Sequence, residues 1–69
     1  MFKDLRKESG FTQVALAEML GIAQNTVSGW ETGVSKPDIP MVVKISKVFN
    51  CDISEVIKCF VSEKETETA

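Results

Sequence analysis

Residues 13–33, QVALAEMLGIAQNTVSGWETG, constrain the fold more than any other part of the chain. Five apolar residues recur at helical spacing on either side of Gly21: Leu16, Ala17, Leu20, Val27 and Trp30. Apolar residues three and four apart indicate amphipathic helices, and a glycine between two such patterns indicates a turn. The pattern therefore predicts two short helices joined at Gly21, and the small side chain of Ala17 lets them cross closely.

Polar side chains on the second of these helices face away from the apolar stripe. Gln24, Asn25 and Ser28 are the outward residues. Glutamine and asparagine carry a paired donor and acceptor that match the major-groove edge of adenine. This arrangement is typical of a helix-turn-helix motif that reads DNA. A plain helical hairpin with solvated polar residues has the same periodicity, so periodicity alone does not decide between the two interpretations.

A wider set of residues has an order and spacing that occur together in a known family: Leu5, Arg6, Gly10, Phe11, Thr12, Gln13, Leu16, Ala17, Leu20, Gly21, Thr26, Val27, Ser28, Trp30, Glu31, Gly33, Lys36 and Pro37. On these residues the chain resembles the Cro/phage-repressor class of helix-turn-helix regulators, often called the XRE family. The resemblance covers about four-fifths of the chain. It implies an all-α, compact five-helix lambda-repressor-like DNA-binding domain whose helix-turn-helix is formed by the second and third helices.

The expected helices are placed by apolar periodicity and by residues that begin or end helices. They cover residues 2–9, 13–20, 24–32, 41–49 and 53–61. Thr12 and Asp52 are expected to cap the helices that follow them, because their side chains accept hydrogen bonds from free backbone N–H groups. Pro37 and Pro40 predict an extended loop over residues 34–40.

A chain of 69 residues with 43% hydrophobic residues can bury one small core, so we expect one domain, residues 1–61, followed by an acidic and disordered tail, residues 62–69. No apolar run reaches the roughly 20 residues that span a membrane, and the first residues lack the apolar segment of a signal peptide. A cytoplasmic location is therefore expected. Cys51 and Cys59, with no histidine in the chain, predict free thiols in the core and no metal or cofactor.

Charge is the feature that fits DNA binding least well. The formal net charge is −2, whereas DNA-binding domains are usually basic. Three glutamates and one lysine lie in residues 62–69, which leaves seven basic and seven acidic residues in 1–61. A neutral domain predicts modest affinity and a shallow salt dependence of DNA binding.

Base contacts are predicted from the outward face of the second helix of the motif. Gln24, Asn25 and Ser28 lie near its N-terminal end, which enters the groove in this motif. Thr26 or Ser28 can bind a phosphate or a base, and we assign Thr26 to the DNA backbone. The alternative is that these residues are simply solvated.

Further roles are implied by the resemblance. Gln13 occupies the family position that contacts the DNA backbone, although capping of its own helix is an alternative. Lys36 lies in the loop where the family commonly contacts phosphate, although a lone loop lysine is usually only solvated. Arg6 and Glu31 match an internal ion pair that positions the recognition helix.

Three residues depart from the family pattern. Ala23 replaces the usual serine or threonine cap of the second helix of the motif. Gly29 is expected on the groove-facing side, where it either allows close approach of the DNA backbone or reads nothing. Asp38 stands where some relatives have a basic residue, and an acid there is expected to repel phosphate.

These observations predict a transcriptional regulator, most simply a repressor, that binds an inverted-repeat operator of double-stranded DNA as a homodimer. The expected dimer surface comprises Cys51, Ile53, Val56, Ile57 and Phe60, unless a core this small needs all of them. The alternative is a protein-binding module, such as an antirepressor or an antitoxin-type partner, with weak DNA binding. An enzyme is not expected, because the chain lacks histidine, tyrosine and carboxylates clustered near a nucleophile.

Overall fold

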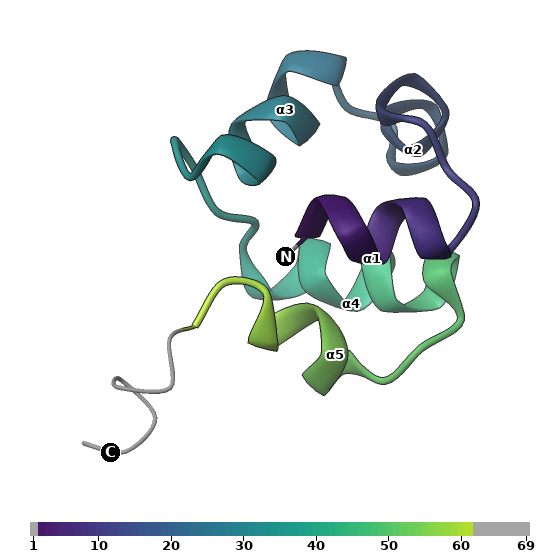
Figure 1. The fold of residues 1–69 in the computed structure, drawn as a ribbon, viewed down its shortest axis with the longest axis vertical. Helices are drawn as coiled ribbons and strands as arrows, with labels where there is room; N and C mark the ends of the chain where they lie inside the picture. Colours follow the sequence, from purple (N-terminus) through teal and green to yellow (C-terminus); the bar gives the residue numbers. More distant parts are fainter. Residues whose placement is uncertain (1, 62–69) are drawn as a thin grey trace.

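The computed structural model describes residues 2–61, which form an all-α fold with no strand in that range (Figure 1). Its helices are α1 (Phe2–Glu8), α2 (Gln13–Leu20), α3 (Gln24–Thr32), α4 (Ile39–Phe49) and α5 (Ile53–Lys58). The predicted bounds of α2 and α3 are confirmed to the residue. The expected tail, residues 62–69, lies outside the described residues.

The boundaries of α2 follow from local chemistry at both ends. The Thr12 hydroxyl accepts the N–H of Ala15 at 3.0 Å, so it caps one of the free donors of the first turn as expected. Gly21 ends the helix at φ 70°, in the left-handed region that glycine adopts without steric penalty. The chain therefore turns sharply after α2 and starts α3 only three residues later.

Helix α4 begins two residues earlier than predicted. The Asp38 side chain accepts the N–H of Met41 at 3.0 Å and so caps α4. Pro40 then lies in the first turn, where a missing N–H costs nothing and the fixed φ suits the helix. The prediction of a loop through Pro40 was wrong because it treated this proline as a helix breaker rather than as a helix start.

Helix α5 is shorter than predicted and ends at Lys58 rather than at Val61. Asp52 occupies its N-cap position, but its side chain makes no capping hydrogen bond. The prediction that Asp52 caps the helix was therefore wrong for the side chain. Beyond Lys58 the chain continues as a turn in which the N–H of Phe60 donates to the carbonyl of Ile57 at 2.9 Å.

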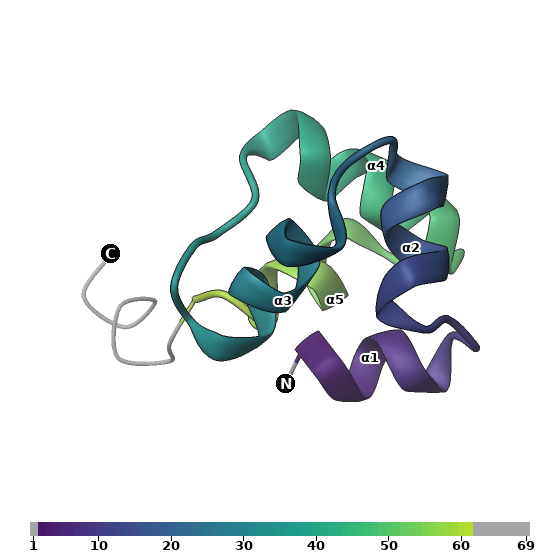
Figure 2. The same ribbon diagram turned by 90° about the horizontal axis from the view of Figure 1, so that it is seen from above.

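The helices form two packed pairs, α2 with α3 and α4 with α5, and α1 joins them through contacts with α3. Helix α4 also contacts α2. In Figure 1, α2 and α3 lie at the top, α1 and α4 in the middle and α5 at the bottom. Seen from above, α1 and α4 lie on opposite sides of α3 (Figure 2). The arrangement leaves one side of the α2–α3 pair facing away from the rest of the fold.

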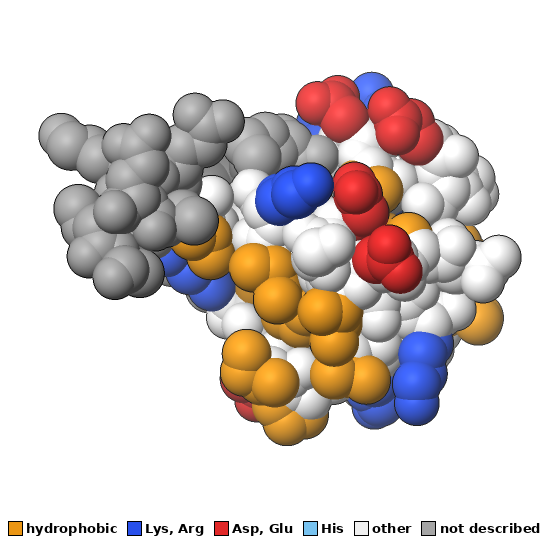
Figure 3. All heavy atoms as spheres, turned by 90° about the horizontal axis from the view of Figure 1, so that it is seen from below, with side chains coloured by type: hydrophobic (Ala, Val, Ile, Leu, Met, Phe, Trp, Pro, Cys, Tyr) orange, Lys and Arg blue, Asp and Glu red, His pale blue; other side chains and the backbone are white. Residues whose placement is uncertain are grey.

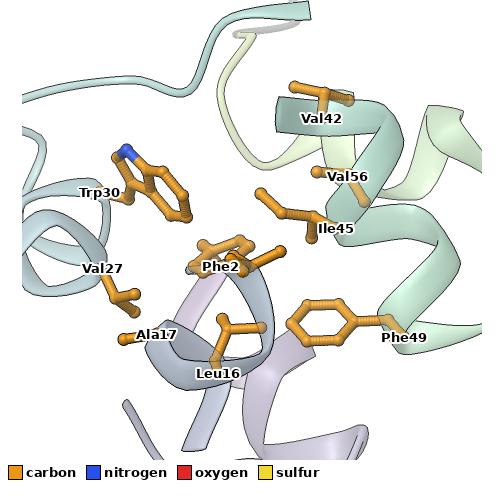
Figure 4. Close-up of a cluster of buried hydrophobic side chains, with 10 residues drawn as sticks. Phe2, Leu16, Ala17, Val27, Trp30, Val42, Ile45, Phe49 and Val56 are labelled. Carbon is orange, nitrogen blue, oxygen red and sulfur yellow. The ribbon is translucent and has the colours of Figure 1, made fainter. Parts of the chain in front are cut away.

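The core collects residues from all five helices around the ring of Phe2 (Figure 4). Its buried members are Phe2, Leu16, Ala17, Leu20, Val27, Trp30, Val42, Ile45, Phe49 and Val56. The Phe2 and Trp30 rings meet edge to face with centroids 5.8 Å apart, a favourable geometry for aromatic pairs. Trp30 is therefore a core residue and fixes α3 against α1.

Both cysteines are free thiols, as predicted, and both are half-buried against the core. Partial burial is the main cause that raises the pKa of each thiol above its ordinary value. A raised thiol pKa lowers the fraction of reactive thiolate at neutral pH. These residues act as small packing groups in the structure.

None of the helices described in residues 2–61 is long and apolar enough to cross a membrane. The longest is α4, with 11 residues. At about 1.5 Å per residue it extends roughly 16 Å, whereas a bilayer core is about 30 Å thick.

Replacing Ala23 by serine should stabilise the domain. Ala23 is the N-cap of α3 and has φ −77° and ψ 148°, the extended conformation of a cap, but no side-chain acceptor. The Ala23→Ser hydroxyl can bond to a free N–H of the first turn without a backbone change, so the free energy of unfolding should rise by about 1 kcal/mol. Urea denaturation measures the change.

Thr12→Ala, which removes the existing cap of α2, is the matched control and should lower the same quantity by a similar amount. If the free energy of unfolding falls in Thr12→Ala but does not rise in Ala23→Ser, a side-chain cap does not stabilise α3.

Candidate nucleic-acid interface

Helix α3 separates its buried and exposed residues by face. Val27 and Trp30 are buried in the core, whereas Gln24, Asn25 and Thr26 are exposed. Ser28 is half-buried. The predicted reading residues therefore lie on the N-terminal half of a helix whose opposite face is held by the core. A surface of this kind presents side chains in fixed positions to a partner.

The first residues of α2 and α3 are joined by a hydrogen bond. The Nε2 amide of Gln24 donates to Oε1 of Gln13 at 3.3 Å. The N-terminal turns of the two helices therefore adjoin, although the two residues are 11 positions apart in the sequence. This contact was not anticipated. No pattern in the sequence predicts it, because the whole of α2 and the turn at Gly21 separate the two glutamines.

Arg6 of α1 and Glu31 of α3 form a nearly buried ion pair. Arg6 Nε lies 2.5 Å from Glu31 Oε2, and the two side chains are 8% and 5% exposed. Arg6 Nη1 also donates to the carbonyl oxygen of Phe11 at 2.7 Å. Every buried side-chain nitrogen and oxygen in the described residues has a hydrogen-bond partner. The pair is thus fully satisfied, as a buried ion pair must be to offset the cost of leaving water.

The carboxyl group of Glu31 stays ionised in this environment. Burial by itself raises its pKa, but hydrogen bonds from Arg6 and Gln13, together with the charges of Arg6 and Lys3, more than offset this effect. The pKa of Glu31 is therefore lowered from its ordinary value. An ionised carboxylate accepts hydrogen bonds and donates none.

Gln13 links the ion pair to the start of α3. Its Nε2 donates to Glu31 Oε1 at 3.0 Å, while its Oε1 accepts from Gln24. Arg6, Glu31, Gln13 and Gln24 thus form one continuous set of hydrogen bonds, here called the polar network. The polar network joins α1, α2 and α3 and ends at an exposed side chain on the outer face of α3.

Lys36 lies apart from Gln24, on the side of the molecule where Glu31 also borders an open hollow. It follows the C-terminal end of α3, where it lines an open hollow with Phe2, Trp30 and Phe60. Gln24 lies at the opposite end of α3, about 13 Å away along a helix of nine residues. The structure therefore brings Gln13 together with Gln24 and separates Lys36 from Gln24.

Gly29 faces the loop that follows α3. A Cβ built at this position would lie 2.9 Å from the Oγ of Ser35. The Gly29 carbonyl also accepts the N–H groups of Val34 and Ser35, at 2.9 and 3.2 Å. The space that we expected to face a groove is occupied by Ser35, so the missing side chain allows the loop to fold back against the helix.

Most of the expected dimer surface is used by the core. Val56 is fully buried, so its assignment to an interface was wrong. Phe60 packs on Phe2 with ring centroids 5.3 Å apart. Cys51 and Ile57 are half-buried against the core, and Ile53 is the most exposed hydrophobic member of the set, at 39%. A core this small needs the inner face of α5, which leaves Ile53 as the residue that faces outward.

Comparison with known proteins identifies the family. A helix-turn-helix family model matches residues 2–56. The chain belongs to the XRE-type helix-turn-helix family. This assignment agrees with the observed fold and confirms the resemblance seen in the sequence.

Relatives of this XRE-type domain carry names of regulators. The chain is 30% identical to the HTH-type transcriptional regulator ImmR of Bacillus subtilis (strain 168), over 96% of this chain and 52% of ImmR. It is 33% identical to the cryptic phage CTXphi transcriptional repressor RstR of Vibrio cholerae, over 93% of this chain and 54% of RstR. The uncharacterized HTH-type transcriptional regulator YgzD of B. subtilis is 33% identical over 78% of this chain and 82% of YgzD.

The chain thus spans about half the length of ImmR and RstR. No solved structure gives a significant match to it.

Removing one partner of the buried ion pair should destabilise this XRE-type domain. Arg6→Ala leaves the Glu31 carboxylate buried without its main partner, and the free energy of unfolding should fall by about 3 kcal/mol. The double variant Arg6→Met/Glu31→Met replaces both charges by apolar groups of similar size and should recover most of that loss. Thermal and urea denaturation of both variants measure the effect. Unchanged stability in Arg6→Ala would show that the pair contributes nothing.

Proposed function

We propose that this XRE-type domain is a sequence-specific, double-stranded DNA-binding transcriptional regulator that acts as a repressor and reads the major groove with α3 as a homodimer. The observation that carries the proposal is the outer face of α3, where the Gln24 amide is held by Gln13 beside the exposed Asn25. The names of ImmR and RstR support regulation, and that of RstR supports repression.

The chemistry of these residues suits base recognition. The amides of Gln24 and Asn25 can each donate to and accept from the edge of an adenine, worth roughly 1–3 kcal/mol of discrimination per base. The hydroxyls of Thr26 and Ser28 suit phosphate or base contacts. The N-terminus of α2, with Gln13, offers free N–H groups to the DNA backbone.

The charge distribution predicts how the DNA backbone is contacted. Residues 13–32, which form the helix-turn-helix, contain no lysine or arginine. Phosphates must therefore be met by amides, hydroxyls and helix N-termini, with Lys36 as a cation at the far end of α3. Because few counterions are released by such contacts, the affinity should depend only weakly on salt.

A homodimer is proposed because a single module makes few base contacts. Two half-sites about 34 Å apart would double them. Hydrophobic side chains gather on the face formed by α4 and α5 (Figure 3). The exposed members in this part of the chain are Ile39, at 68%, Ile53, at 39%, and Val61, which follows α5. We propose that a second copy of the chain covers Ile53 and Ile39.

A protein-binding module, such as an antirepressor or an antitoxin-type partner, is the second candidate. The lack of lysine and arginine in residues 13–32 favours it. The other departures do not, because Asp38 caps α4 and Gly29 accommodates Ser35. The structural roles of Asp38 and Gly29 explain why these residues are present without assuming that DNA binding has been lost.

Selection from random duplexes tests DNA reading. The protein should retain duplexes that carry an enriched inverted repeat, identified by sequencing at low and moderate salt. Gln24→Ala and Asn25→Ala should each lose the preference at one base pair per half-site, because each removes one paired donor and acceptor. Lys58→Ala, an exposed residue on α5 at the opposite end of the molecule, is the control and should select the same repeat. Retention of no duplex by folded protein would favour the protein-binding module.

Charge placed on the proposed dimer surface should separate the protomers. Ile53→Lys buries an unpaired ammonium in the dimer, so the dissociation constant measured by sedimentation equilibrium should rise at least tenfold, about 1.4 kcal/mol at 25 °C. Val34→Lys is the matched control, because Val34 is 83% exposed in the loop after α3. Equal dimerisation of Ile53→Lys and the unsubstituted protein would place the interface elsewhere.

A further inference from the structure

We propose that Glu31 is a positioning residue for DNA reading: through Gln13 it fixes which way the amide of Gln24 faces and so which base Gln24 accepts. This inference rests on the proposed function, because it concerns the specificity of the same surface. It adds a role in base selection to the ion pair of Arg6 and Glu31, which would otherwise have only a structural role.

The first step is the carboxylate. Glu31 Oε1 accepts hydrogen bonds from Arg6 Nη2 at 3.3 Å and from Gln13 Nε2 at 3.0 Å. Because an ionised carboxylate is only an acceptor, Gln13 must turn its nitrogen toward Glu31. Arg6 holds the carboxylate from the other side, through Nε and Nη2. Because Arg6 is nearly buried, the orientation of the Glu31 carboxylate is fixed.

The second step is the transfer of this orientation to α3. Because the Nε2 of Gln13 donates to Glu31, its Oε1 faces Gln24, and Gln24 must donate an N–H to this oxygen. A reversed Gln24 amide would place two carbonyl oxygens against each other. Each amide in the polar network therefore has one favoured orientation, and the ion pair determines both.

The third step is the base. Gln24 uses one N–H on Gln13, which leaves its second N–H and its carbonyl oxygen for DNA. That pair matches the N7 acceptor and the N6 donor of adenine. Guanine presents two acceptors, N7 and O6, so the fixed carbonyl oxygen would face O6 without a hydrogen bond. An amide held in this orientation favours adenine over guanine more strongly than one that can reverse.

A double variant separates orientation from folding. Arg6→Met/Glu31→Met removes the acceptor that anchors Gln13 and retains the side chains of Gln13, Gln24 and Asn25, and circular dichroism checks that the variant is folded. Gln24→Ala identifies the base pair that Gln24 reads. At that pair the ratio of affinities for adenine and guanine should fall roughly fivefold or more in the double variant. The preference at the pair read by Asn25 should be unchanged, because Asn25 is not part of the polar network.

If the double variant does not fold, Gln13→Met provides the same test with the ion pair intact. It removes both hydrogen bonds of Gln13 and should lower the same ratio. A ratio equal to that of the unsubstituted protein in the folded variant would overturn the inference. A uniform loss at both base pairs would also overturn it, because that result indicates displacement of α3 as a whole.

A measurement without DNA keeps this inference separate from the proposed function. In the free protein, the side-chain amide protons of Gln13 should exchange with solvent more slowly than those of Asn25, as measured by nuclear magnetic resonance. The difference should disappear in Arg6→Met/Glu31→Met. Equal exchange rates for Gln13 and Asn25 in the unsubstituted protein would overturn the fixed orientation. A protein that selects no DNA but shows the slow exchange would refute the proposed function and leave the orientation supported.

Discussion

The buried pairing of Arg6 with Glu31 is the interaction on which the geometry of the domain depends. Apolar packing between short helices has little directional preference, so it holds α1, α2 and α3 together without defining their relative rotation. Two opposite charges that are nearly excluded from water tolerate only arrangements in which both are satisfied. Because Arg6 also bonds to the carbonyl of Phe11, the pair fixes the chain between α1 and α2 as well. The position of α3 therefore follows from a polar constraint within an apolar core.

Helix α3 combines two roles that do not compete for the same side chains. Val27 and Trp30 hold it against Phe2 and the rest of the core, whereas Gln24 and Asn25 face outward at its N-terminal end. One face of α3 supplies stability, and the other is the face that we propose for recognition. A domain near the lower size limit for independent folding benefits from this separation, because it can spare few core residues for a second purpose.

The extent to which sequence predicted this structure depended on how local each feature is. Apolar spacing and local stop signals placed α2 and α3 to the residue, because both depend on neighbours within one or two turns. The start of α4 was misplaced because Pro40 has opposite meanings inside a helix and in its first turn. The burial of Val56 was missed because amphipathic spacing does not show how much of a short helix the core will cover.

The candidate site shows the same limit more sharply. Outward-facing amides on α3 follow from periodicity, and the pairing of Arg6 with Glu31 was suggested by family resemblance. The hydrogen bonds of Gln13 to Glu31 and to Gln24 follow from neither, because they require two helix starts and the end of α3 to meet in space. The bonded residues are 11 positions apart in one case and 18 in the other, and only the three-dimensional path of the turn between α2 and α3 brings them together.

The polar network also bears on how such a domain acquires a new operator. Neighbouring side chains that share a hydrogen bond do not respond additively to substitution. Gln24 shares one with Gln13, so a new residue at position 24 inherits a partner selected for an amide. Asn25 is exposed and outside the polar network, and it can change alone. Under the proposed function, divergence of recognition should therefore proceed in single steps at Asn25 and in coupled pairs at Gln24, with epistasis confined to one end of α3.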